Sequence, residues 1–127
     1  MGSLFSLVFS RAHVPASLKA EIDAVETKGI LTLTQPGQWA GRERNHVPRC
    51  EVKDGRVTVS SGHRMESDHW IDYLYAKDEK GALIGAVKLA YTDAPTATFR
   101  IPPGTKNVTG FNSCKLHGSW ATDATPV

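Results

Sequence analysis

The feature that most constrains the fold is a succession of short β-type segments, separated by turn sequences, that fills the chain beyond Gly29. Apolar and polar residues alternate within these segments, and Asp54-Gly55 between two of the runs is a strong hairpin signal. The segments with β character are 30–34, 50–60, 69–77, 82–91, 96–101 and 106–113. Short strands at regular spacing predict an all-β fold, an antiparallel β-sandwich of about seven strands.

A helical pattern precedes the strands. Three apolar residues recur at positions i, i+4 and i+7 of one helical face, and charged residues occupy the other positions. These apolar residues are Leu18, Ile22 and Val25. Pro15 suits the first turn of a helix. The pattern predicts one amphipathic helix over 16–28, within an N-terminal extension (1–36) that precedes the main domain (37–127). We expect this helix to pack on the domain or on a partner subunit.

The composition excludes several classes of partner. The 127 residues are 40% hydrophobic and 22% charged, with a net charge of +2, which is ordinary for a globular protein. No run of Lys and Arg is interleaved with aromatic residues, and no apolar stretch is long enough to cross a bilayer. We therefore expect neither a nucleic-acid partner nor a membrane partner. The two cysteines cannot form a disulfide framework, and Cys50 is interpreted as a small buried hydrophobe.

The segment 4–9 bears on the cellular compartment. It is apolar, but it is too short and lacks the basic flank of an intact secretion signal. It is either the remnant of a trimmed signal or an edge strand, and the sequence does not decide between the two. The compartment is therefore unknown: a cytoplasmic location is favoured, and a periplasmic one applies if a signal was removed.

Four of the five histidines gather with one cysteine in three clusters of ligand-like spacing. The clusters are His46 alone, His63 with His69, and Cys114 with His117. Imidazole and thiolate groups suit a transition metal, whereas calcium and magnesium prefer oxygen ligands. Taken singly, each residue is more simply a solvated loop histidine or a core cysteine. A sandwich that serves as an interaction module, with histidines merely on its loops, is therefore one alternative. His13 has no ligand-type neighbour and is expected on the surface.

Three motifs carry a resemblance to a known family. They are His-Val-Pro at 46–48, His-x5-His at 63–69 and Cys-x-x-His-Gly-x-Trp at 114–120. Trp39 and Gly41 also match a Trp-x-Gly that precedes the first motif in that family. The chain resembles the iron-binding domain of the superoxide reductases, the neelaredoxin and desulfoferrodoxin family, over about residues 38–120.

The resemblance implies an immunoglobulin-like sandwich that holds one iron ion per chain, cycling between Fe(II) and Fe(III). The family pattern implies four equatorial histidines, an axial thiolate and a sixth position open to solvent. On that pattern the metal ligands are His46, His63, His69, His117 and, on the axis, Cys114. The implied activity is one-electron reduction of superoxide to hydrogen peroxide, with electrons from a rubredoxin-like donor. The family also assembles as dimers or tetramers, so we expect a homo-oligomer.

The chain departs from the family pattern beside the first histidine. Much of the family has a Glu-Lys pair there, in which the Lys is thought to draw in superoxide, whereas this chain has Arg44 and Asn45. Electrostatic attraction of the superoxide anion needs only positive charge near the mouth of the site. We take Arg44 and Lys115 as the candidate catalytic residues on that basis. Arg42 and Arg64 are the other cations that could supply this field.

The replaced pair keeps a second function open. The alternative is a metal-binding, electron-transfer or redox-sensing member of the same fold that lacks superoxide reductase activity. Glu43 lies one residue before the position of the family glutamate, and it reaches the open site only if the loop is longer here. Two cysteines cannot build the additional cysteine-rich domain of two-centre members, so the resemblance is to the one-iron type.

Overall fold

The computed structural model describes residues 8–9 and 14–127. Its helical elements are α1 (Ala16–Glu26), the 3-10 helix η2 (Gly37–Trp39) and α2 (Glu43–His46). The strands are β1 (Val8–Phe9), β2 (Ile30–Leu31), β3 (Arg49–Lys53), β4 (Arg56–Ser60), β5 (Ile71–Asp78), β6 (Leu83–Lys88), β7 (Thr96–Arg100), β8 (Asn107–Cys114), β9 (Gly118–Ala121) and β10 (Thr125–Pro126). Among these residues, no helix is long and apolar enough to span a bilayer.

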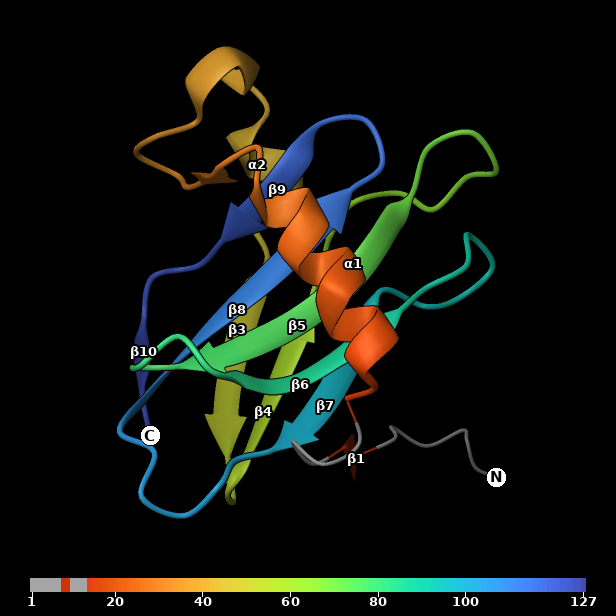
Figure 1. The fold of residues 1–127 in the computed structure, drawn as a ribbon. Coiled ribbons are helices and arrows are strands. Elements are labelled where there is room, and N and C mark those ends of the chain that lie inside the picture. Colours follow the sequence, from red (N-terminus) through yellow and green to blue (C-terminus); the bar gives the residue numbers. More distant parts are fainter. Residues whose placement is uncertain (1–7, 10–13) are drawn as a thin grey trace.

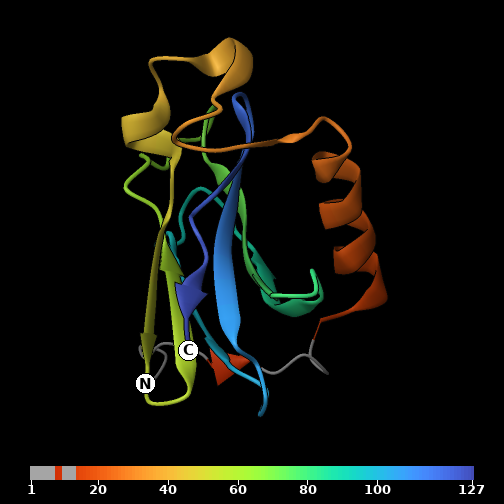
Figure 2. The same ribbon diagram turned by 90° about the vertical axis from the view of Figure 1, so that its left-hand side faces the viewer.

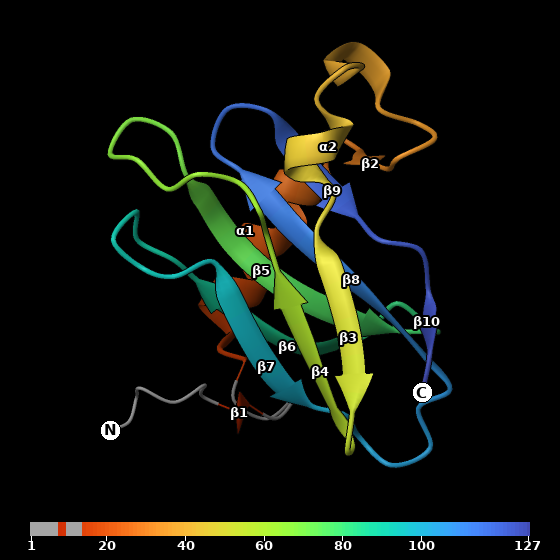
Figure 3. The ribbon, with the colours of Figure 1, turned by 180° about the vertical axis from the view of Figure 1, so that it is seen from behind.

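The strands form two sheets that pack face to face, which confirms the predicted all-β sandwich (Figure 1). One sheet has the order β1-β7-β4-β3, and Figure 3 shows it from its own side of the molecule. The other has the order β2-β9-β8-β5-β6, with β10 also paired to β8. The central pairings are antiparallel, whereas the short strands β1 and β2 join β7 and β9 in parallel. The predicted turn at Asp54-Gly55 joins β3 to β4, and both residues have positive φ.

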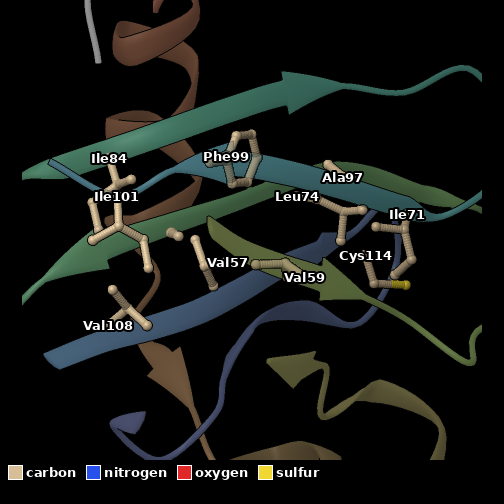
Figure 4. Packing of buried hydrophobic residues seen from close by; sticks show 11 residues of the cluster. Val57, Val59, Ile71, Leu74, Ile84, Ala97, Phe99, Ile101, Val108 and Cys114 are labelled. Atoms are coloured by element: carbon tan, nitrogen blue, oxygen red, sulfur yellow. The ribbon is translucent and has the colours of Figure 1, made fainter. Parts of the chain in front are cut away.

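The core between the sheets consists of apolar side chains on the inner faces of the strands. Val57, Val59 and Phe99 come from the first sheet, and Leu74 and Val108 come from the second; each is fully buried. Cys114 ends the same layer, where its sulfur lies beside Ile71 at one end of the sandwich (Figure 4). The hydrophobic core therefore fixes the place of a candidate metal ligand.

Helix α1 covers the outer face of the second sheet (Figure 2). Ile22 is fully buried there, and Leu18 and Val25 pack against the same cluster, so the predicted apolar face of the helix is confirmed. Two tyrosines of β5 bind the helix through its carboxylates: Tyr73 donates to Glu21 (2.5 Å) and Tyr75 donates to Glu26 (2.7 Å). The helix ends at Glu26, two residues before the predicted end. The division of the chain at residue 36 stays a prediction, and His13 lies outside the described residues.

Candidate metal centre

His46 is held rigidly by backbone groups around it. It ends the short helix α2, its side chain is 3% exposed, and its Nδ1 donates to the carbonyl of Arg42 (2.9 Å). From the central strand β8, the amide of Asn112 donates to the His46 carbonyl (2.7 Å) and reaches the Ser61 hydroxyl (3.3 Å). Because Nδ1 carries the proton, Nε2 presents a lone pair. That atom is buried and has no hydrogen-bond partner among the described residues.

His63 and His69 come from the loop between β4 and β5. His63 is buried, and its Nδ1 donates to the carbonyl of Arg64 (2.6 Å), which also leaves its Nε2 as the free lone pair. The loop is closed by a pair of backbone hydrogen bonds between Glu66 and His69 (3.0 Å each). This closure places Nε2 of His69 at 3.1 Å from Nε2 of His63 and at 3.1 Å from the Cys114 sulfur.

Cys114 and His117 lie at the turn between β8 and β9. Gly118 closes this turn with φ +85°, a conformation that side chains with a Cβ rarely adopt. The backbone N–H groups of Leu116 and His117 donate to the Cys114 sulfur. His117 Nδ1 lies 3.7 Å from that sulfur, and the buried indole of Trp120 donates to the His117 carbonyl (2.9 Å).

The five side chains converge on one point. One ligand atom from each lies within 4.8 Å of all the others: they belong to His46, His63, His69, Cys114 and His117. The four imidazole rings also close a cycle in which each ring contacts the next, with centroids 4.5–4.9 Å apart. Four nitrogens in a cycle with a sulfur beside them are a donor set for a transition metal. The orphaned Nε2 of His46 fits such an ion, because a metal is the partner that this buried lone pair lacks.

Burial sets the protonation of these groups. Desolvation lowers the pKa of His46 to about 4, and it also lowers the pKa values of His63 and His117. These imidazoles are therefore neutral near pH 7, which is the form that binds a metal. Desolvation raises the pKa of the Cys114 thiol, and the two backbone N–H groups on the sulfur oppose that rise. Metal binding thus supplies the charge that favours the thiolate and releases its proton.

Two cavities lined by described residues adjoin the centre, one on its histidine side and one on its cysteine side. A cavity of about 290 Å³ opens over the histidines, and the described residues that line it include Arg42, Asn45 and Arg64 but neither Arg44 nor Lys115. Arg44 is exposed on α2. Lys115 lines a separate cavity on the cysteine side.

Some of the groups that build the centre carry no signal in the sequence. Asn112 lies within a strand and carries the buried hydrogen bond to His46, yet no motif marks it. Trp39 stands out in the sequence only as part of a motif, and its ring meets the His117 ring edge-on at 4.7 Å between centroids. The carboxylate of Glu43 accepts from the Gly41 N–H (2.9 Å), and Glu43 is not among the described residues that line the histidine-side cavity.

Comparison with known proteins agrees with this geometry. Residues 38–123 match the family model described as desulfoferrodoxin. The chain is similar to the superoxide reductase from Treponema pallidum, with 32% identity and a TM-score of 0.55 over 65% of this chain and 68% of that chain. Two further structures show the fold alone. A superoxide reductase (1Fe-SOR) from Giardia intestinalis has 21% identity and a TM-score of 0.57, covering 65% of this chain and 98% of that one. A superoxide reductase (neelaredoxin) from Ignicoccus hospitalis has 24% identity and a TM-score of 0.62, covering 80% of this chain and 95% of that one. A search of curated proteins gives no match.

Proposed function

The chain belongs to the desulfoferrodoxin family, and on this premise we propose that it is a mononuclear non-haem iron superoxide reductase. The observation that carries the proposal is the convergence of four imidazoles and one thiol sulfur on a single point. The ligands of the iron are His46, His63, His69, His117 and Cys114. Iron held there would supply the one electron that, with two protons from solvent, reduces superoxide to hydrogen peroxide, and an external donor would restore that electron.

The residues around the ligands hold the site ready for this reaction. The Nδ1–H bonds of His46 and His63 to backbone carbonyls fix the two rings with Nε2 turned inward. The N–H groups of Leu116 and His117 stabilise negative charge on the Cys114 sulfur. Cys114 does not line the histidine-side cavity, so the sulfur lies away from the opening through which an anion reaches the centre.

Positive charge at the mouth supports superoxide as the substrate. Arg42 and Arg64 line the histidine-side cavity together with the amide of Asn45, and they attract a small anion toward the imidazoles. The predicted pair of Arg44 and Lys115 stays part of the proposal as a source of longer-range field. Arg44 lies on the same helix as His46, and Lys115 directly follows Cys114.

The proposal also covers the redox cycle of the iron, the electron donor, the oligomeric state and the cellular location. One iron per chain alternates between the ferrous and ferric forms, a rubredoxin-like protein supplies the electron, and the chain assembles as a homo-oligomer. A cytoplasmic location stays the favoured prediction. The statements on iron, electron donor and assembly rest on the family resemblance, whereas the location rests on the segment 4–9.

The test is the stoichiometry of the reaction with pulse-generated superoxide. A reductase supplied with electrons yields one hydrogen peroxide for each superoxide, whereas dismutation yields one for every two. We expect Arg42→Glu and Arg64→Glu to lower the second-order rate constant by about tenfold at low salt and less at high salt. Arg100→Glu makes the same charge change at the far end of β7 and should have little effect. Iron binding without reduction of superoxide favours the alternative of an electron-transfer or redox-sensing protein.

A further inference from the structure

A cavity of about 530 Å³ lies on the cysteine side of the centre, and the proposed reaction does not use it. One wall is built from the N-terminal extension, by residues that include Val25, Lys28 and Leu31. A second wall comes from the turn between β8 and β9, by residues that include Cys114, Leu116 and Ser119. Because the family match begins at residue 38, the extension wall comes from a part of the chain that the family model does not describe.

The walls suit a flat apolar ligand. Leu31 packs between the backbones of Gly37 and Gly118, where an added Cβ would lie 3.3 Å from one of its methyl carbons in each case. The two glycines therefore let Leu31 pack closely against the backbone of this wall. Trp39 lines the same cavity, and Leu116 adds an apolar side chain that is 55% exposed. A concave site of this volume, with apolar and aromatic walls and a few polar groups, is typical of sites for small organic molecules.

The charged groups that line the cavity give it a net positive charge. Lys28 and Lys115 contribute two ammonium groups, against the single half-buried carboxylate of Asp72. The Lys115 ammonium lies 4.5 Å from the ring centroid of Trp70 and interacts electrostatically with Asp72. Lys115 therefore offsets the carboxylate, and Lys28, exposed in the turn after α1, leaves the excess positive charge. A ligand with an anionic group complements this arrangement.

We propose that this cavity binds a small planar aromatic anion of the flavin mononucleotide class, with the ring against Leu31, Trp39 and Leu116 and the anionic group at Lys28. A cavity of this size, partly open to solvent, accommodates such a molecule. The ligand lies beside Cys114 and on the ring that contacts His117. That position is suited to an electron carrier; this functional role rests on the proposed function, and the binding itself does not.

The experiment is a titration of flavin mononucleotide with the full chain, followed by flavin fluorescence and repeated with metal-free and iron-loaded protein. We expect saturable binding in both forms, weakened at least about tenfold by Lys28→Glu. Lys53→Glu makes the same charge change on the distant β3–β4 hairpin and should leave the affinity within about twofold. Riboflavin, which lacks the phosphate, should bind more weakly, and Lys28→Glu should not affect its affinity. Leu116→Ala should weaken both ligands alike.

Several results would overturn the proposal. It is wrong if flavin mononucleotide shows no saturable binding, if Lys53→Glu weakens binding as much as Lys28→Glu does, or if inorganic phosphate alone displaces the flavin completely. Binding of rubredoxin that is lost in Lys28→Glu, without any binding of the flavin, would assign the surface to an acidic protein instead. Because the titration does not measure superoxide, its failure is distinct from a failure of the proposed enzyme activity.

Discussion

Asn112→Ala tests how the sandwich core supports the metal centre. Asn112 is fully buried in β8, and its amide is a direct side-chain link from that central strand to the backbone of His46. The substitution removes a 2.7 Å hydrogen bond and leaves the His46 carbonyl unpaired in the interior. Losing the bond costs about 1 kcal/mol, and the unpaired acceptor adds about 1–3 kcal/mol. We therefore expect the free energy of unfolding of the metal-free protein to fall by about 2–4 kcal/mol.

The same change should weaken metal binding, because the peptide that carries His46 loses its support. Loss of a hydrogen bond that orients a metal ligand typically costs about 10–100-fold in affinity. Stability is measured by urea denaturation of the chelated protein, and affinity by competition with a chelator. Asn107→Ala, the same substitution at the other end of β8, is the matched control and should leave metal affinity unchanged. Lower stability with unchanged metal affinity would refute the idea that Asn112 positions His46.

Three further predictions follow from other contacts. Gly85→Ala should destabilise the protein by about 1–3 kcal/mol in thermal or urea unfolding, because a Cβ there would lie 2.9 Å from the Phe99 Cβ and closer still to the ring. A cost that Phe99→Ala, which removes the ring, does not partly relieve in the double variant would contradict this cause. In the metal-free protein, His46 should lower the stability by about 3 kcal/mol between pH 6.5 and pH 4, because its pKa is lowered to about 4 and the unfolded chain binds the proton first. His46→Gln should remove this part of the pH dependence and leave the part that comes from His63 and His117, and an unchanged slope would exclude His46 as a source. Glu26→Gln should speed amide exchange in α1 by at least about tenfold while iron content stays the same, because Glu26 accepts from Tyr75 and pairs with Lys77 (2.7 Å each). Loss of iron in that variant would show that α1 supports the ligands, contrary to its place on the outer face.

Much of the fold was predictable from local patterns. Alternation and turn residues located most of the strands, and Asp54-Gly55 fixed one hairpin, since positive φ at two successive residues is what its turn requires. Periodicity alone fails within β5, where strict alternation places Ile71 on the face of Tyr73 and Tyr75. The register of β5 against β8 shifts between Ile71 and Tyr73, so Ile71 joins Leu74 in the inner core. A bulge of this kind leaves no local signal in the sequence.

The features of the metal centre that the sequence does not predict also depend on long-range folding. The residue types and spacing of the five ligands identified them as a candidate set, and the structure brings those side chains together. The charged groups at the mouth were harder to choose, because four cations lie near the ligands in sequence and only folding decides which of them face the histidines. Arg42 and Arg64 line that opening, whereas Lys115 turns toward the cysteine side. The cavity formed with the N-terminal extension depends on a long-range pairing, that of β2 with β9.

The most direct test of the central claim is the iron content of anaerobically purified protein together with its visible spectrum before and after oxidation. We expect one iron per chain and a sulfur-to-iron charge-transfer band that appears on oxidation. The band should vanish in Cys114→Ser, because the serine oxygen cannot replace the thiolate as the donor of that transition. Absence of iron after reducing purification, or a band that survives in Cys114→Ser, would contradict the assignment of these five residues as an iron centre.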